Sequence, residues 1–472
     1  MAGVRVAIVG GGITGLAAAH RLLEQGVERS AIVVLESDDR LGGQIRTERH
    51  GDLLLEAGPD TLVAQKPAAV ALCERLGLGG DLETAAGGGT EILLDGRLVP
   101  VPQGFLMMAP TSRRAVLGSP LFTWKGKLRM LAEPWVKPRP AALEDESLAS
   151  FVTRRFGREA LDRVAEPVVA SLFTADAERL SLRMTMPRFL DLEAEQGSVT
   201  PALRRGVRRP FGHGTGRGGF VSVRGGLERI VEALAERLEG CIRTRSRVVR
   251  VSRSGDGPWT LTLAGGETIA ADALLLACPA FAAARALSEH DPALAEDLSV
   301  LRYAPCATVN LVYRREAVRG ALASLGFFVP RVEGAPILAC SYVSEKFSGR
   351  APRELVVLRV FLGGATRPGI VEGDDDALIR VAHDALRPVL AIEGEPVLAR
   401  VHRFPRAMPQ FDVGAVAWVE RVRARAASHA GLEIAGSVMG AVGLPDCIRS
   451  GEEAATRLAS RMAALPAIAA SP

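Results

Sequence analysis

The sequence predicts an α/β protein that also contains an α+β part built on a mixed sheet and a separate helical part. The α/β prediction rests on an apolar run at 5–9, a helical pattern from 14 to about 25, and a second apolar run at 31–35. This order is a β-α-β unit, because parallel strands need a crossover connection. Four apolar runs between 307 and 363, with one helix at 374–390, predict the mixed sheet. Apolar residues at helical spacing between 147 and 196 predict the helical part.

The remaining elements follow in chain order. We expect a helix at 226–239, three short antiparallel strands between 247 and 270, a buried strand at 273–278 that rejoins the parallel sheet, a strand at 432–435 and a helix from about 446. The glycine-rich segment 212–219 is expected to be a loop. The resulting domains are a discontinuous nucleotide-binding domain of 1–88, 215–295 and 405–472, a mixed-sheet domain of 89–98 and 296–404, and a helical domain of 99–214.

Composition narrows the class of protein. The chain has 472 residues, 48% hydrophobic and 24% charged, with a net charge of +4, which is typical of a soluble globular protein of two or three domains. Three Tyr, four Trp and no recognisable binding module argue against nucleic acid as a partner. The six cysteines are scattered without metal-ligand spacing, so we expect reduced thiols, no metal and a cytoplasmic location. The N-terminus does not resemble a signal peptide.

Segment 98–136 combines large apolar side chains with Lys and Arg. It holds Phe105, Phe122, Trp124 and Trp135. Two interpretations stay open for it: an interfacial surface on the inner face of the cell membrane, or a buried helical layer. No stretch reaches the roughly 20 apolar residues of a membrane span.

A glycine motif joins the first predicted strand to the first helix. In Gly10-x-Gly12-x-x-Gly15, the first glycine makes the tight turn, the second lets a pyrophosphate approach the backbone, and the third packs helix against strand. Ile13 and Thr14 belong to the same turn, and we predict that they contact the cofactor too. Glu36 ends the second strand, where a carboxylate accepts hydrogen bonds from ribose hydroxyls. The sequence therefore predicts a dinucleotide site.

The segment after the second strand indicates which dinucleotide binds. Glu36 to Gly43, with Arg40, Gly42 and Gly43, resembles the extension found in glutathione-reductase-like FAD proteins, and Glu56-x-Gly58-Pro59 resembles their next cofactor-lining turn. This resemblance implies FAD, held without a covalent bond, and places Arg40, Gly42, Gly43, Gly58 and Pro59 beside it.

The C-terminal turn is predicted to complete the flavin site. Gly436, Val442, Gly443 and Leu444 lie between the last strand and the last helix, where backbone amides stabilise negative charge on a reduced flavin. The FAD-protein resemblance adds Val248, on a strand whose backbone reads adenine.

Three separated segments carry a sharper resemblance. The stretch 436–455, the motif Met408-Pro409-Gln410-Phe411-x-x-Gly414, and the helical segment with Glu146-Ser147-Leu148 and Glu166-Pro167 are similar to protoporphyrinogen and coproporphyrinogen oxidases. The resemblance implies a Rossmann-type FAD domain, a substrate sheet and a membrane-facing helical domain. It also implies six-electron oxidation of a porphyrinogen by O2 in haem biosynthesis, peripheral membrane contact and a homodimer.

The same resemblance suggests substrate residues. Leu338 and Phe361, on predicted strands, match pocket positions, although core packing explains them too. Asp60 either stabilises positive charge near the flavin or caps its turn. The family often has an arginine that binds a propionate where this chain has Thr90, and a histidine where it has Ala415. Arg97 is the candidate cation to replace that arginine as the propionate partner.

Two other functions remain open at this point. The same FAD frame occurs in amine oxidases and carotenoid desaturases, and a non-catalytic FAD-binding protein would also keep the glycine motif. Protoporphyrinogen IX and coproporphyrinogen III are not distinguished by the sequence.

Overall fold

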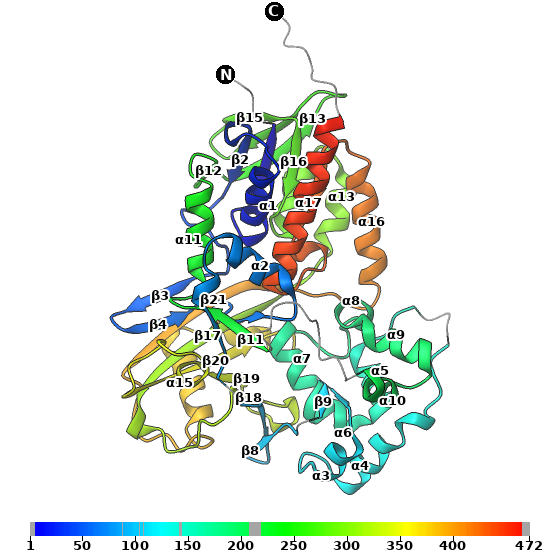
Figure 1. Ribbon diagram of the computed structural model, residues 1–472, viewed down its shortest axis with the longest axis vertical. Coiled ribbons are helices and arrows are strands. Elements are labelled where there is room, and N and C mark those ends of the chain that lie inside the picture. Colours follow the sequence, from blue (N-terminus) through cyan, green and yellow to red (C-terminus); the bar gives the residue numbers. More distant parts are fainter. Residues whose placement is uncertain are drawn as a thin grey trace, which may run out of the picture.

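The computed structural model describes residues 5–86, 88–102, 104–106, 108–140, 144–206 and 219–464. A parallel sheet with its helices forms one end of the molecule, near both termini, and the mixed sheet and the helical part lie next to each other at the other end (Figure 1). Most of the predicted 212–219 loop falls outside the described residues.

The parallel sheet confirms the predicted β-α-β unit and the return of the strand predicted at 273–278, and it also contains the strand predicted at 432–435. Its order is β12 (Ile242–Arg243), β2 (Ile32–Leu35), β1 (Val6–Val9), β16 (Ala273–Leu276) and β22 (Leu432–Ile434). Val6 pairs with Ile32 on one side and with Ala273 on the other. The sequence of β1, Val-Ala-Ile-Val, is apolar at every position because both faces of the sheet are covered.

Helices cover one face of this sheet. Val6 and Ile8 pack in one core with α1 (Ile13–Glu24), α2 (Pro67–Arg75), α11 (Glu228–Arg237) and α17 (Leu444–Ala464). In Figure 1, α17 lies beside α1 although the two helices come from opposite ends of the chain.

A second core covers the opposite face. Ala7 and Val9 pack there with helices and with a small antiparallel sheet. The strands are β13 (Val248–Arg253), β14 (Trp259–Leu263) and β15 (Thr268–Ala271), and the helices are α12 (Ala280–Leu287), α13 (Pro292–Ser299) and α16 (Ala415–Ala427).

The mixed sheet has the order β21 (Leu398–Pro409), β17 (Tyr303–Arg314), β20 (Leu355–Gly363), β19 (Ile337–Tyr342), β18 (Gly326–Phe328), β7 (Glu91–Leu94) and β8 (Arg97–Pro100). Only the β18–β7 pairing is parallel in the described part of this sheet. Helix α15 (Asp375–Leu386) packs on one face. The other face turns toward the parallel-sheet domain, where the Thr308 hydroxyl donates to the Ala57 carbonyl at 2.7 Å.

Small sheets connect the two large ones. They are the hairpin β3 (Thr47–His50) with β4 (Leu53–Glu56), and the group β5 (Leu62–Val63), β11 (Phe220–Val223) and β6 (Leu82–Thr84). A buried ion pair between Arg350 and Glu56, at 3.2 Å, joins this region to the mixed-sheet domain.

The helical part is more broken than the apolar spacing predicts. It contains the hairpin β9 (Phe105–Leu106) and β10 (Ala109–Pro110), then α3 (Arg113–Gly118), α4 (Trp124–Leu131), α5 (Leu148–Phe156), α6 (Arg158–Ala160), the π-turn Leu161–Ala165, α7 (Glu166–Phe173), α8 (Leu182–Thr185), α9 (Pro187–Gln196) and α10 (Val199–Gly206). Gly157 and Thr174 both have positive φ, 96° and 49°, and interrupt the helix at those points.

Segment 98–136 is buried in part and exposed in part. Phe122 and Met130 are buried in the core of the helical part. Trp124, Leu128 and Trp135 instead expose 69%, 65% and 77% of their surface. Among the described helices, none has the length and apolar character that crossing a bilayer requires.

Candidate functional site

The three motif glycines have distinct structural roles. Gly10 has a φ of 114°, and a Cβ there would lie 2.7 Å from the Ala277 carbonyl oxygen. A Cβ on Gly15 would lie 2.0 Å from the Gly10 carbonyl oxygen, so only glycine lets α1 approach β1 this closely. A Cβ on Gly12 would meet no protein atom within 4 Å. Gly12 therefore faces open space, as a glycine does where a ligand approaches the backbone.

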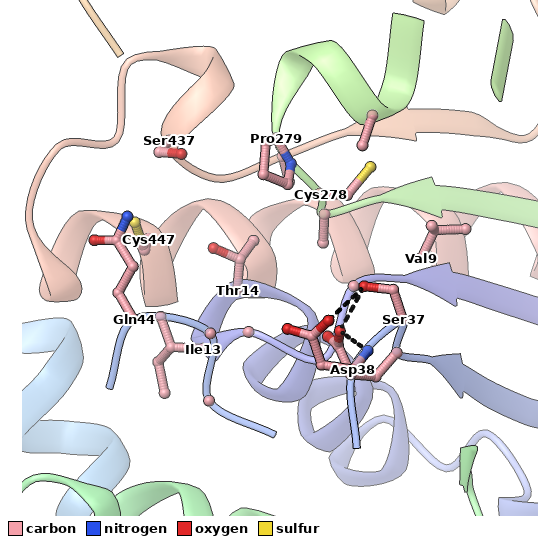
Figure 2. A pocket seen from close by; sticks show the side chains of 18 of the residues that line it. Val9, Ile13, Thr14, Ser37, Asp38, Gln44, Cys278, Pro279, Ser437 and Cys447 are labelled. Carbon is pink, nitrogen blue, oxygen red and sulfur yellow. Dashed lines mark hydrogen bonds between the residues drawn. The ribbon is translucent and has the colours of Figure 1, made fainter. Parts of the chain in front are cut away.

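That open space is a cavity of about 580 Å³ at the N-terminal end of α1. The first turn of α1 has no acidic residue, which leaves the positive end of the helix dipole available for an anion. Of the predicted cofactor residues, those that line the cavity are Gly10, Gly12, Ile13, Thr14, Glu36, Gly42, Gly43, Val248, Val442 and Leu444. Figure 2 shows Thr14 from α1, Cys278 after β16, and Ser437 and Cys447 from the C-terminal segment around this space.

Glu36 is held in place by its own loop and by the glycine turn. One carboxylate oxygen accepts from the Gly11 amide at 2.6 Å, and the other accepts from the Asp38 amide at 2.9 Å and from the Ser37 hydroxyl at 3.0 Å. Because a carboxylate has about four lone-pair positions, Glu36 keeps capacity for a ligand hydroxyl.

The other predicted cofactor residues do not line the cavity. Arg40 donates to the carbonyls of Gly43 at 2.6 Å and Ile45 at 2.5 Å and so fixes the loop that lines the cavity. A Cβ on Gly58 would lie 1.9 Å from the Gln44 carbonyl oxygen, and one on Gly436 would lie 2.8 Å from the Thr14 hydroxyl. Gly15, Arg40, Gly58, Pro59, Gly436 and Gly443 are absent from the lining of this described cavity, and their contact with a cofactor stays a prediction.

Two cysteines line the cavity. Burial raises the pKa of the Cys447 thiol to about 11 and that of the Cys278 thiol to about 12. Both thiols are therefore protonated at neutral pH and are poor nucleophiles. All six cysteines of the chain are free.

Comparison with known proteins assigns this architecture. The family model for flavin-containing amine oxidoreductases matches residues 13–459. The chain belongs to the flavin-containing amine oxidoreductase family. A coproporphyrinogen III oxidase of Bacillus subtilis is 31% identical over 95% of this chain and 96% of its own length. Protoporphyrinogen oxidase 1 of Spinacia oleracea chloroplasts is 29% identical over 96% of this chain and 83% of its own length.

A solved structure agrees with these relatives. The crystal structure of a protein from Exiguobacterium sp., described as a protoporphyrinogen oxidase, has a TM-score of 0.85 and 29% identity, and the match covers 98% of this chain and 100% of that one. The full-length similarity places this family member with the copro- and protoporphyrinogen oxidases.

The cavity of this family member has the chemistry that a flavin dinucleotide requires. Gly12 leaves room for a pyrophosphate at a helix N-terminus, and Glu36 presents a carboxylate for a ribose. Met408, Val442 and Leu444 supply apolar surface for a ring. The residues present therefore fit the group that the family carries.

Asp60, the predicted catalytic residue, lies in a buried ion cluster and does not line the described cavity. It accepts from Lys346 Nζ at 3.1 Å and from the Thr61 hydroxyl at 2.5 Å, and Arg359 Nη1 lies 3.7 Å away. Burial would raise the pKa of Asp60, but the Lys346 and Arg359 charges outweigh it and hold that pKa well below the ordinary value. Asp60 is thus an ionised group with no proton to donate; a role at the flavin stays a prediction.

The predicted substrate residues lie in two separate parts of the mixed sheet. Leu338 and Phe361 lie on neighbouring strands of the mixed sheet, β19 and β20, as expected. Leu338 is buried, and Phe361 is partly exposed. Arg97 is exposed at the start of the edge strand β8, and Thr90 lies just before β7. Arg97 therefore stays a prediction.

Sequence reasoning missed several cavity and cluster residues. Cys278 and Pro279 line the cavity just after β16. Because ligands of parallel sheets bind at the carboxyl ends of the strands, the position of these two residues at the end of a predicted strand could have identified them as cavity residues. Gln44 also lines it, and its amide donates to the Ala407 carbonyl at 2.6 Å. Arg359 precedes Phe361 by two residues, which in a strand places both on one face.

Proposed function

We propose that this chain is an FAD-dependent porphyrinogen oxidase of haem biosynthesis. In the proposed reaction the porphyrinogen loses six hydrogen atoms and becomes a porphyrin, while three O2 are reduced to three H2O2. Bound FAD would supply the two-electron acceptor for each of the three oxidations, and O2 would reoxidise it. The observation that carries the proposal is the glycine-lined cavity with Glu36, in a chain similar to porphyrinogen oxidases over nearly its whole length.

The residues proposed to hold FAD follow from their positions. Gly12, Ile13 and Thr14, at the N-terminus of α1, bind the pyrophosphate through backbone amides. Glu36 accepts from the adenosine ribose, and Val248 contacts the adenine. The turn at Val442 and Leu444 approaches the flavin ring. None of the thiols is proposed to form a covalent link, because burial keeps them protonated.

Coproporphyrinogen III is the substrate we favour over protoporphyrinogen IX. The coproporphyrinogen III oxidases of Bacillus subtilis and Propionibacterium freudenreichii are 31% and 32% identical to this chain, against 29% for the Spinacia oleracea protoporphyrinogen oxidase. Coproporphyrinogen III carries four propionates where protoporphyrinogen IX carries two propionates and two vinyl groups. Its extra acidic arms call for cationic side chains at the pocket.

The test is side-by-side turnover of the two porphyrinogens by the purified holoprotein, followed by porphyrin fluorescence and by O2 uptake. We expect faster oxidation of coproporphyrinogen III and bleaching of the flavin by either substrate in the absence of O2. Flavin that neither porphyrinogen bleaches would refute the enzyme assignment and favour a non-catalytic FAD protein. Faster turnover of protoporphyrinogen IX would refute the substrate choice alone.

We also propose that the helical part docks on the inner face of the cell membrane. Trp124, Leu128 and Trp135 are exposed close together in sequence; Lys125 and Lys127 lie among them, and Lys137 follows two residues after Trp135. Exposed aromatics flanked by cations suit an interface with anionic lipid. Sedimentation with anionic vesicles should fall strongly in a Trp124→Ser, Trp135→Ser variant, and equal sedimentation would refute the docking surface.

A further inference from the structure

Three charged side chains are buried together between the mixed sheet and the parallel-sheet domain. The side chains of Asp60, Lys346 and Arg359 expose only 11%, 9% and 3% of their surface. Asp60 accepts a hydrogen bond from Lys346 at 3.1 Å, whereas Arg359 approaches it only to 3.7 Å, which is too long for a hydrogen bond. The cluster therefore contains two cations and one anion, and Lys346 makes the shorter contact with that anion.

Arg359 is poorly satisfied by the protein around it. Its Nε and Nη1 are buried and have no hydrogen-bond acceptor among the described residues. A guanidinium has five N–H donors and keeps its charge in proteins, so it cannot relieve the cost of burial by losing a proton. A buried cation without its own counter-charge destabilises the fold unless an anion accompanies it. The unpartnered N–H groups of Arg359 could therefore bind a second anion beside Asp60.

The neighbours of Arg359 on the sheet add a second donor. Arg359 on β20 pairs in register with Ser341 on β19, so both side chains project from the same face. The Ser341 hydroxyl oxygen is also buried without a partner among the described residues. On the other side Arg359 pairs with Asn310 of β17, whose amide donates to the Glu56 carbonyl at 3.1 Å. Arg359 and Ser341 thus stand opposite each other with unpartnered donors, while Asn310 on the other side has an unpartnered side-chain oxygen, which is an acceptor.

Phe361 connects this polar pair to an apolar surface. It follows Arg359 by two residues on β20 and shares its face, and its ring centre lies 4.6 Å from the guanidinium carbon. Phe361 is partly exposed even though its face of the sheet turns inward, toward the parallel-sheet domain. The sheet therefore presents an accessible aromatic ring next to a cation whose Nε and Nη1 have no hydrogen-bond acceptor among the described residues.

We infer that Arg359, with the Ser341 hydroxyl, binds a carboxylate arm of the substrate while Phe361 contacts the macrocycle. This inference rests on the proposed function and names a specificity determinant for it. A carboxylate matches the free N–H donors in charge and geometry, and an arginine–carboxylate contact is strongest where water is excluded. Arg359 thus supplies the cation that Thr90 does not, from the buried face of the sheet rather than from its exposed edge at Arg97.

The test compares coproporphyrinogen III with its tetramethyl ester, which has the same ring and no charged arms. In Arg359→Gln we expect the KM for the acid to rise about tenfold, the change of a lost charge-assisted contact, and the KM for the ester to stay within about twofold. Ser341→Ala should shift the acid KM in the same direction by a smaller factor. Arg319→Gln, at an arginine in an exposed ion pair with Glu393, is the matched control and should change neither KM. Flavin content and melting temperature are measured for each variant.

Other outcomes overturn the inference. Equal changes for acid and ester would make Arg359 a structural partner of Asp60, and a carboxylate-dependent loss in Arg97→Ala instead would move the anchor to the sheet edge. If Arg359→Gln does not fold, the parent must still prefer the acid to the ester by about tenfold, with the preference reduced in Ser341→Ala. If the parent oxidises neither macrocycle, the proposed function fails. Fluorescence titration with coproporphyrin III and its ester then tests the carboxylate site by binding alone, and equal affinities would refute it.

Discussion

Gly12 and Gly15 lie three residues apart, yet the structure predicts opposite consequences for their replacement. A side chain at Gly12 would enter the cavity without touching the protein, since a Cβ there meets no atom within 4 Å. We therefore expect Gly12→Val to lose flavin and keep its fold. Its backbone, at φ −73° and ψ 175°, is allowed for any residue. Valine is a poorer helix N-cap than glycine, which lowers the free energy of unfolding by about 1 kcal/mol or less. It also makes the unfolded chain less flexible, which raises that free energy by a similar amount.

The magnitude of the flavin effect follows from the space that valine takes. Its branched side chain would hold a pyrophosphate off the backbone amides of α1, and we expect flavin affinity to fall about 100-fold, or about 2.8 kcal/mol. Gly15→Ala acts on the protein instead. Its Cβ would lie 2.0 Å from the Gly10 carbonyl oxygen, and relieving that contact must displace α1 from β1. We expect a loss of about 3 kcal/mol of unfolding free energy, with or without flavin.

The assay measures the flavin-to-protein ratio after purification, the flavin dissociation constant, and the urea unfolding of flavin-free protein for both variants. Two results would refute the reasoning. One is Gly12→Val protein that keeps the parental flavin ratio. The other is flavin-free Gly12→Val protein that unfolds as readily as Gly15→Ala, which would show that Gly12 serves the fold and not the ligand.

Three further predictions follow from the site. Glu36→Ala should weaken flavin binding by roughly 1.5–3 kcal/mol and also lower the melting temperature, because the Gly11 and Asp38 amides lose their acceptor; an unchanged flavin dissociation constant would exclude the ribose contact. Asp60→Asn should lower the unfolding free energy by about 3–5 kcal/mol at neutral pH, because it leaves two buried cations without an anion. The folded-state pKa of Asp60 lies below its ordinary 3.8, so the stability it adds is present above that pH and is lost as the pH falls below it. Denaturant titrations from neutral to acid pH should show the variant approaching the parent below about pH 4, while Glu393→Gln, in an exposed ion pair with Arg319, should match the parent throughout. Cys447→Ser should retain flavin, and acid denaturation should release the flavin from the parent as well; flavin that stays with the precipitated parent would show a covalent link.

Local sequence was sufficient wherever the structure depends on neighbours in the chain. The Val-Ala-Ile-Val strand, the glycine turn and the carboxylate at Glu36 were predictable because strand burial, backbone conformation and ribose recognition each act within one β-α-β unit. The four apolar runs of the mixed sheet became β17 to β20 for the same reason. Thr174 shows the limit of such local reasoning. It interrupts the predicted helical stretch with a left-handed conformation that its residue type does not favour.

Tertiary structure alone decided which distant residues meet. Asp60 and Lys346 are 286 positions apart, and Gln44 and Ala407 are 363 apart, so no spacing in the sequence could pair them. Arg359 looked like any strand residue until strand order placed Ser341 and Asn310 on either side of it. Arg97 had a suitable charge but fell on an exposed edge strand. The physical reason is that the energy of a charge depends on its burial and its partners, and the packing of the whole chain sets both.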